Sequence, residues 1–286
     1  MKIGFIGAGR VGSSMGRYLS EKGAGIAGYY DASGAAAVEA ADFTGTDSFS
    51  DLEQLVSLSD TLFITTPDGI IGEVWDCIKK MSIHNKIVCH CSGSLSSEVF
   101  SGIESTGASG CSIHPMLAFA DKFTSYEQLN NAFLTIEGQE HALSVMKNFF
   151  AEYGNLVCEI DSGCKAKYHA AASILSNQVV AVLDAGYRLL TECGFSPMKA
   201  VDATEKLVLG NVKNICDKGP VNALTGPIER GDVGTVRKHL EVLEEEDRQM
   251  YIILAKKLVR IAAEKNPSKD YGEMRRYLDE EYSSNF

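Results

Sequence analysis

The first thirty-one residues constrain the fold of this chain more than any other stretch. The apolar run Lys2–Ile6 predicts a buried parallel strand, and it leads directly into the glycine-rich turn Gly7–Gly12. Residues 13–22 then predict a helix, and a second apolar strand at residues 25–30 ends on Asp31. A strand, a glycine-rich turn, a helix and a second strand in this order are typical of the βαβ unit that binds a dinucleotide.

The spacing of the glycines in this turn fits a pyrophosphate. Gly7 allows the tight turn, Gly9 lets the backbone approach the phosphates, and Gly12 lets helix and strand pack closely. The N–H groups at the start of the helix, together with the helix dipole, attract the negative charge. Asp31 lies where an acid accepts hydrogen bonds from a ribose hydroxyl, about twenty residues beyond the glycines. The predicted cofactor-binding residues of this region are Gly7, Ala8, Gly9, Arg10, Val11, Gly12, Asp31 and Ser33. A βαβ unit with a purely structural role is the alternative.

Charge and cysteine usage exclude several classes of protein. The formal net charge of −11 and the isoelectric point near 5.1 disfavour binding to nucleic acid or to a membrane surface. No apolar run has the length of a membrane-spanning helix, and the chain enters a strand at once, without room for a signal peptide. The eight cysteines form no CxxC pair and have no zinc-like spacing with histidine. We therefore expect no bound metal and a reducing, cytoplasmic location.

The rest of the first half alternates strands with helices. Apolar runs predict strands at 61–65 and 86–91, and further strands at 110–115, 132–137 and 155–160. This alternation predicts a doubly wound, mostly parallel sheet, in which ligands lie beyond the carboxyl ends of the strands. The turns at these ends add Thr66, Pro67, Ser92 and Gly93 as cofactor-binding candidates, and Ser92 and His114 as substrate-binding candidates. Because a lone histidine in a strand is more often a hydrogen-bonded core residue, that alternative stays open for His114.

The pattern changes to helical spacing from Gly163 onward. Apolar residues recur with helical periodicity in residues 164–193, 197–217 and 232–265. We therefore expect a dinucleotide-binding domain over residues 1–161 and an all-α domain over residues 162–286.

A polar stripe follows the first helix of the second domain. Lys165, His169, Ser173 and, with slight drift, Ser176 or Asn177 recur at intervals of about four on a helix that is otherwise rich in Ala and Leu. Hydride transfer to a carbonyl group needs a proton donor and a group that polarises the oxygen. The stripe therefore predicts proton transfer by Lys165 and His169, orientation of the substrate by Asn177, and a substrate contact at Ser173. A solvated helix face is the alternative.

A loop rich in Gly and Pro separates two of the later helices, at residues 219–232. Its Asn222, Thr225 and Arg230 are candidates for binding a substrate carboxylate, for which arginine has the right bidentate geometry. An equally good interpretation is a capping loop, with Asp232 starting the next helix and Arg230 in a surface ion pair.

Four motifs taken together resemble a known family. They are HCSGSLSS at 90–97, SIHPMLAF at 112–119, KAKYHAAASILSN at 165–177 and NALTGPIERGD at 222–232. They resemble the Rossmann-like family that carries a DUF2520 carboxy-terminal domain. This family is related to the β-hydroxyacid dehydrogenases, ketopantoate reductases and pyrroline-carboxylate reductases.

This resemblance extends to about residue 262 and implies several properties. They are an α/β Rossmann domain that binds NAD(P), an all-α domain similar to the carboxy-terminal domain of 6-phosphogluconate dehydrogenase, and a homodimer formed through that helical domain. Members are commonly labelled NADP- or coenzyme F420-dependent oxidoreductases, and some relatives are reported as an alternative type of ketopantoate reductase. The implied substrate is a small 2-keto acid.

Two features depart from the superfamily pattern. Its dehydrogenases place Lys and Asn four residues apart, whereas here Lys165 is followed at that spacing by His169, with Asn177 eight residues further on. In addition, a carboxylate at Asp31 repels a 2′-phosphate and favours NAD, whereas the resemblance favours NADP. Arg10, inside the glycine-rich turn, is placed to pair with a phosphate.

The sequence thus predicts an oxidoreductase that uses NAD or NADP. It transfers hydride between the nicotinamide and a small 2-keto or 2-hydroxy acid, as a ketopantoate reductase does. One alternative is a dinucleotide-binding sensor without turnover, and another is a deazaflavin-linked NADP oxidoreductase.

Overall fold

The computed structural model describes residues 1–285. The chain divides into two compact units, Met1–Val179 and Val180–Phe286. The first unit contains the whole sheet and also the first helix after it. The predicted domain boundary at residues 161–163 lies between the last strand and that helix.

The first unit is built on one eight-stranded sheet in the order β3-β2-β1-β4-β5-β6-β7-β8. Only β6 and β7 are antiparallel to each other, and every other neighbouring pair is parallel, which confirms the expected mostly parallel sheet. The strands are β1 (Lys2–Ile6), β2 (Gly25–Tyr30), β3 (Asp47–Phe49), β4 (Thr61–Ile64), β5 (Ile87–His90), β6 (Ser109–Pro115), β7 (Phe133–Gly138) and β8 (Leu156–Glu159). The order reverses between β1 and β4, so this is the switch point at which an α/β sheet binds its ligand.

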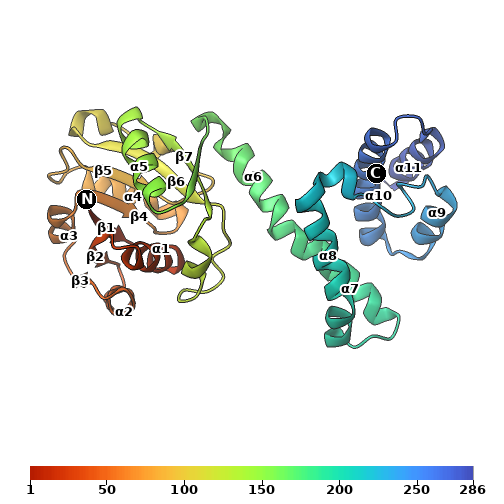
Figure 1. Ribbon diagram of the computed structural model, residues 1–286, viewed down its shortest axis with the longest axis horizontal. Coiled ribbons are helices and arrows are strands. Elements are labelled where there is room, and N and C mark those ends of the chain that lie inside the picture. Colours follow the sequence, from red (N-terminus) through yellow and green to blue (C-terminus); the bar gives the residue numbers. More distant parts are fainter. Residues whose placement is uncertain (286) are drawn as a thin grey trace. The chain divides into compact units, whose positions relative to one another are not determined.

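Helices cover both faces of this sheet (Figure 1). They are α1 (Arg10–Glu21), α2 (Gly34–Thr44), α3 (Leu52–Leu58), α4 (Asp68–Ile78) and α5 (Glu140–Glu152). Helix α6 (Lys165–Leu175) follows the last strand and extends away from the sheet (Figure 1). Short 3₁₀ turns lie at η1 (Ser97–Val99), η2 (Ile103–Thr106), η3 (Ser125–Leu129) and η4 (Ser162–Cys164). One buried cluster joins α1, α2 and α5 to the sheet, and a second joins α3 and α4 to it, so the sheet is doubly wound.

The ends of these helices follow local side-chain chemistry. Ser33 accepts a hydrogen bond from the backbone nitrogen of Ala36 and begins α2. This helix runs to Thr44 and stops at Gly45, whose φ of 70° is left-handed. The next strand, β3, begins two residues further on, at Asp47.

The long helix expected over residues 164–193 is interrupted at Ser176. This residue has φ −123° and ψ −75°, outside the helical region. Its hydroxyl donates a hydrogen bond of 2.7 Å to the carbonyl oxygen of Ala172. The non-helical backbone of Ser176 marks the break, so α6 ends at Leu175 and α7 begins at Asn177.

The second unit is helical throughout its described residues, as the periodicity predicts. Its helices are α7 (Asn177–Glu192), which begins in the first unit, α8 (Pro197–Ala223), α9 (Val233–Val242), α10 (Glu245–Lys265) and α11 (Gly272–Asn285). Helix α8 is broken at Gly219, which has a φ of 75° and precedes Pro220. Val236, Ile252, Val259 and Leu278 belong to the buried core of this unit. Within residues 1–285, no helix is long and apolar enough to cross a membrane.

Candidate dinucleotide and substrate site

Two of the three turn glycines are required by the fold itself. Gly7 has a φ of 108°, and a Cβ there would lie 2.8 Å from the backbone of Thr65 and Thr66. A Cβ at Gly12 would collide with the carbonyl oxygen of Gly7. The Thr65 hydroxyl also donates to that carbonyl, at 2.7 Å. The turn is therefore held tightly between the ends of β1 and β4.

Gly9 differs from its two neighbours because the fold does not require it. Its φ of −78° is open to any residue, and a Cβ there would meet no atom within 4 Å. It lies at the amino terminus of α1, where backbone N–H groups and the helix dipole attract an anion. The free space at Gly9 is the space that a pyrophosphate takes up in this kind of turn.

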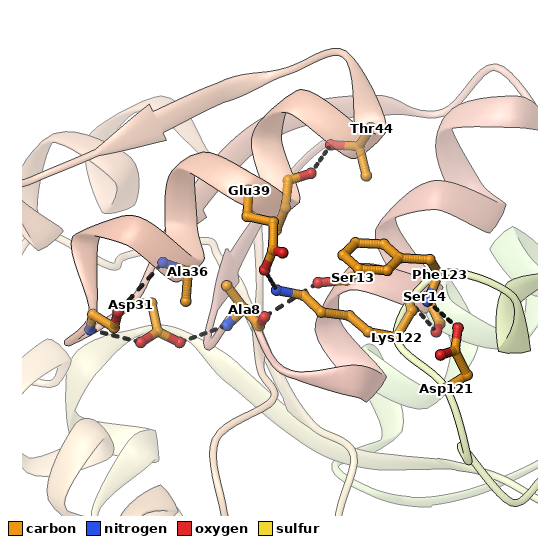
Figure 2. Close-up of polar contacts among 12 residues, drawn as sticks. Ala8, Ser13, Ser14, Asp31, Ala36, Glu39, Thr44, Asp121, Lys122 and Phe123 are labelled. Carbon is orange, nitrogen blue, oxygen red and sulfur yellow. Dashed lines mark hydrogen bonds and ion pairs between the residues drawn. The ribbon is translucent and has the colours of Figure 1, made fainter.

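The carboxylate of Asp31 ties the glycine turn to the start of α2 (Figure 2). One oxygen accepts a hydrogen bond of 2.7 Å from the backbone nitrogen of Ala8, and the other accepts one of 2.8 Å from Ser33. Each carboxylate oxygen has a further lone pair, which leaves an acceptor for the ribose hydroxyls. The acid predicted to bind the ribose is thus fixed beside the turn.

The end of β4 presents an unpaired hydroxyl next to the same turn. Among residues 1–285, Thr66 Oγ1 is buried and has no hydrogen-bond partner. A buried polar group is usually paired, so an orphan at this position fits a site that a ligand completes. Pro67, which follows it, is exposed and precedes α4.

The segment Met116–Thr124 extends from the end of β6 to the helices beside the glycine turn. The Ser14 hydroxyl of α1 donates to the carbonyl oxygen of Lys122, at 3.3 Å (Figure 2). The Lys122 ammonium forms an ion pair of 2.5 Å with Glu39 of α2. Hydrogen bonds from Phe123 and Thr124 lower the pKa of Asp121, and the positive charge of Arg10 contributes to this. Nothing in the sequence pattern indicated this crossing.

The Ser92–Ser94 turn, after β5, is anchored to the start of α4. The hydroxyls of Ser92 and Ser94 both donate to Oδ2 of Asp68, at 2.8 and 2.7 Å. The Ser92 oxygen accepts in turn from the backbone nitrogen of Leu95, at 3.0 Å. The turns after β4 and β5, both predicted to bind the cofactor, are therefore joined through Asp68.

His90 is a hydrogen-bonded core residue that shapes this turn. Its Nδ1 accepts from the backbone nitrogen of Ser92, so Nε2 is the nitrogen that donates to the carbonyl oxygen of Ser96, with both distances at 3.2 Å. Burial lowers the pKa of His90 to about 4, against an ordinary value of 6.5. The neutral ring is thus a structural part of the turn.

We expect this histidine to make the protein less stable in mild acid. Because its folded-state pKa lies below its unfolded value, the unfolded chain binds a proton between about pH 6.5 and pH 4 that the native state does not. The unfolding free energy that the neutral ring contributes above about pH 6.5 is therefore lost as the pH falls toward 4. Between pH 7 and pH 4.5, the wild type should lose about 2 to 3 kcal/mol more unfolding free energy than a His90→Gln variant. Urea unfolding at the two pH values measures this difference.

The control for this comparison is His141→Gln, which changes an exposed histidine. It should retain the pH dependence of the wild type. Equal losses in His90→Gln and the wild type would contradict the assignment of a depressed pKa to His90.

Lys165 begins α6 and is buried against the sheet. Its side chain donates to the carbonyl oxygen of Ser92, at 2.9 Å, and to the hydroxyl of Ser112, at 2.7 Å. The residue is only 2% exposed. Burial lowers the pKa of Lys165, and the carboxylates of Glu137 and Asp68 partly oppose this by favouring its charged form.

His114, near the end of β6, belongs to a chain of three polar side chains. Its Nδ1 lies 2.6 Å from the hydroxyl oxygen of Tyr168, which in turn accepts a hydrogen bond of 2.8 Å from the hydroxyl of Thr135. A Cβ at Gly93 would lie 2.8 Å from Nε2 of His114 and 2.6 Å from Cδ2 of His169. Both imidazoles therefore lie against the turn after β5, and glycine is the residue that leaves room for them.

A pocket of about 500 Å³ opens beside the two histidines. It is lined by His114, Met116, Leu117, Ala118, Phe119, Ala120, His169, Ala172, Ser173, Leu175, Ser176 and Asn177. Three members of the predicted stripe, His169, Ser173 and Asn177, thus share one pocket with His114. Lys165, the first member of the stripe, lies beneath the Ser92 turn and does not line the pocket.

The candidates at residues 222–230 belong to the second unit. There, Asn222 donates a hydrogen bond of 3.1 Å to the carbonyl oxygen of Lys218. Asp232 accepts from the backbone nitrogen of Thr235 and begins α9, as the capping interpretation requires. Thr225 and Arg230 lie in the loop that precedes this cap, and their role toward a carboxylate stays a prediction.

Sequence reasoning missed four residues of this region: Asp68, Ser112, Thr135 and Tyr168. Asp68 directly follows Thr66-Pro67, and Tyr168 directly precedes His169, so both are adjacent to predicted site residues. The other two lie in strands whose pairing brings them to the site. Within residues 1–285, no group of His, Cys, Asp or Glu side chains is arranged to hold a metal ion.

The sheet order, the glycine turn and the fixed acid define a Rossmann-type dinucleotide-binding fold. Comparison with protein families agrees with this. A Rossmann-like domain matches residues 1–115, and DUF2520, a domain of unknown function, matches residues 132–258. The chain thus carries a Rossmann-like domain followed by a DUF2520 domain.

Several solved structures share this fold. A protein from Thermotoga maritima is 27% identical, with 93% of this chain and 99% of that chain covered and a TM-score of 0.70. A Bacteroides fragilis protein assigned as an NADP oxidoreductase is 20% identical, with 91% and 98% covered and a TM-score of 0.72. A pyrroline-5-carboxylate reductase from Coxiella burnetii is 17% identical, with 94% and 98% covered and a TM-score of 0.63. No curated protein sequence matches the chain significantly. The chain thus has the fold of dinucleotide-dependent oxidoreductases.

Proposed function

We propose that this protein is a nicotinamide-dependent oxidoreductase acting on a small 2-keto or 2-hydroxy acid. The observation that carries the proposal is the open space at Gly9, at the amino terminus of α1, in a turn whose other two glycines are required by packing. The unpaired hydroxyl of Thr66 beside that turn supports it. So do the NADP-bound pyrroline-carboxylate reductase from Plasmodium falciparum and the NADPH-bound reductive aminase from Aspergillus terreus, which have the same fold.

We assign residues of the first unit to successive parts of the cofactor. The amides of Gly7–Gly12 bind the pyrophosphate, Asp31 binds the adenosine ribose, and the Ser92–Ser94 turn lies at the nicotinamide end. The nicotinamide, when bound, supplies or takes up the hydride. The pocket beside Gly93 receives the substrate, where Ser173 and Asn177 offer hydrogen bonds to its carboxylate and oxygen.

The keto acid and a ketopantoate-like skeleton come from the family resemblance, and a panel of 2-keto acids tests them. Consumption of reduced cofactor with one of them supports the proposal, whereas cofactor binding without turnover of any favours the sensor alternative.

The eight cysteines are all free thiols, which suits a reducing, cytoplasmic compartment.

We expect the protein to prefer NADH to NADPH. Because two backbone amides fix the Asp31 carboxylate beside the ribose position, its charge repels a 2′-phosphate. NADH should therefore raise the melting temperature more than NADPH does. In an Asp31→Asn variant the preference should fall on the order of tenfold, which is about 1.4 kcal/mol of binding free energy. Thermal-unfolding titrations with both cofactors measure the effect.

The matched control removes a negative charge from the neighbouring helix. Asp42→Asn changes an exposed residue of α2 and should keep the preference of the wild type. A wild type stabilised by NADPH alone would contradict the role given to Asp31. No stabilisation by either cofactor would contradict the proposed function as a whole.

We also propose that two copies of the chain associate through the second unit. Its helices α7 and α8 expose large apolar side chains, among them Val180, Met198, Leu207 and Leu209, which are 60 to 75% exposed. Large apolar side chains are exposed at many positions along these two helices, and the family resemblance indicates a second copy of the chain as the partner that covers them. Size-exclusion chromatography with light scattering should give twice the 30.9 kDa mass of one chain.

A Leu207→Glu variant is expected to shift this assembly toward single chains, because it places a charge in the apolar contact. Lys206→Glu, which changes the exposed neighbour on the same helix, should stay dimeric. A single-chain mass for the wild type at micromolar concentration would contradict the proposal.

A further inference from the structure

We propose that His114 is the catalytic residue that exchanges a proton with the substrate oxygen, and that Tyr168 positions it. This inference rests on the proposed function and names the acid–base residue of the same site. It differs from the expectation drawn from the helix stripe, which placed proton transfer on Lys165 and His169.

The lining of the pocket limits which groups can exchange a proton with a bound substrate. Its titratable residues are His114 and His169. The Lys165 ammonium is instead directed at the Ser92 carbonyl and the Ser112 hydroxyl, and its residue is nearly inaccessible. An acid or base must come within hydrogen-bond reach of the reacting oxygen, which favours the two histidines.

Of the two histidines, His114 is the one that is held in place. It lies on β6 opposite Thr135 of β7, and Tyr168 joins the two side chains by hydrogen bonds of 2.6 and 2.8 Å. His169 is exposed, and within residues 1–285 no hydrogen bond fixes its ring. A catalytic group that is already oriented avoids the cost of ordering it in the transition state.

The contact with Tyr168 determines which nitrogen is left to react. In the tautomer whose Nδ1–H donates to the Tyr168 oxygen, Nε2 carries the free lone pair, and this nitrogen faces Gly93. Gly93 follows β5, and the carboxyl ends of β4 and β5 are where the reacting end of a dinucleotide lies in this fold. Nε2 is thus directed to the place where substrate and nicotinamide meet.

The electrostatic surroundings give this imidazole the protonation state of a base. Burial lowers the pKa of His114 to about 4, and the positive charge of Lys165 adds to this while Asp68 opposes it. Burial raises the pKa of Tyr168, so the phenol keeps its proton. At neutral pH, His114 is therefore an uncharged base.

The proposed step transfers one proton and one hydride. In the direction of oxidation, Nε2 of His114 takes the proton of the substrate hydroxyl as the C–H bond releases its hydride to the nicotinamide. The alcohol becomes a ketone, and the imidazolium donates from Nδ1 to the Tyr168 oxygen. In reduction, the imidazole first takes up a proton from water, and Nε2 of the resulting imidazolium donates it to the carbonyl oxygen as the carbon gains the hydride.

The test compares His114→Gln with His169→Gln in the NADH-bound protein, using the 2-keto acid that the wild type reduces fastest. His114→Gln should lower turnover on the order of 100-fold or more, the usual contribution of a general acid or base, without weakening NADH binding. His169→Gln should lower turnover less than about tenfold. Wild-type turnover in His114→Gln, or an equal loss in both variants, would overturn the inference. If neither NADH nor NADPH stabilises the wild type, the proposed function fails as well.

A second readout does not depend on turnover. The ring nitrogens of His114 are followed by ¹⁵N NMR in the NADH-bound protein, with His114→Gln used to assign them. Oxamate, an analogue of a 2-keto acid, should shift the Nε2 resonance of His114. Tyr168→Phe should change the protonation of Nδ1 and the acid limb of the pH–rate profile. A shift confined to His169, or no change in Tyr168→Phe, would overturn the roles given to His114 and Tyr168.

Discussion

A Gly9→Val variant is expected to fold normally and to lose dinucleotide binding. The backbone at Gly9 has a φ that valine adopts, and a Cβ there meets no protein atom within 4 Å. The side chain instead fills the space of the pyrophosphate and blocks its hydrogen bonds to the turn. Loss of two charge-assisted bonds, at about 1.5 kcal/mol each, weakens binding on the order of 100-fold.

The measurement is a thermal-unfolding titration with NADH. At a concentration one hundred times the wild-type dissociation constant, the ligand stabilises the wild type by about 2.7 kcal/mol. The variant should show almost none of this stabilisation, while its melting temperature without ligand matches that of the wild type.

Two matched glycine substitutions separate binding from folding. Gly12→Ala forces a Cβ onto the Gly7 carbonyl oxygen, so its melting temperature without ligand should fall, with a cost of about 1 to 3 kcal/mol. Gly72→Ala, in α4, places a Cβ at an ordinary contact distance of 3.8 Å, so it should leave NADH binding unchanged and raise the melting temperature, since alanine is favoured over glycine in a helix by about 1 kcal/mol. Wild-type NADH affinity in Gly9→Val would refute the assignment of a phosphate site to this turn.

A Lys165→Met variant is expected to destabilise the first unit. Methionine keeps the apolar length of the side chain but removes the donors to the Ser92 carbonyl and the Ser112 hydroxyl. Since these groups are buried and the donor is charged, the loss should be about 2 kcal/mol. The melting temperature of the transition that involves the sheet should then fall by about 4 to 8 °C.

The control is Lys167→Met, two positions along the same helix, where the side chain is exposed. Its melting temperature should match that of the wild type within about one degree, because an exposed lysine contributes little. A Lys165→Met variant as stable as Lys167→Met would show that the two buried hydrogen bonds contribute nothing, and that α6 docks on the sheet by other contacts.

Features that depend on residues close together in the chain could be predicted from the sequence. The strand, glycine turn and helix at the amino terminus lie within twenty-one residues, and the structure has them at β1, Gly7–Gly12 and α1. The same holds for Asp232, which caps α9 through the backbone N–H group of Thr235, three residues away. Ser33, predicted to bind the cofactor, instead caps α2 with its hydroxyl. The interruption at Ser176 was missed because a serine within a helical pattern does not by itself indicate a non-helical backbone.

Which residues face a ligand depended on contacts between distant segments. The fourfold spacing placed Lys165 and His169 on one helix face. In the structure, Lys165 is buried beneath the Ser92 turn, whereas His169 lines the pocket. His114 and Tyr168 are fifty-four residues apart, and the pairing of β6 with β7 brings Thr135 beside them. Helical periodicity shows which residues share a face of a helix. It does not show what packs against each part of that face. The sequence alone therefore determined a Rossmann domain with a glycine-rich turn between its first strand and its first helix. Only the tertiary structure decided that Lys165 is buried while His114 lines the pocket, because burial and hydrogen bonding are set by partners far away in the chain.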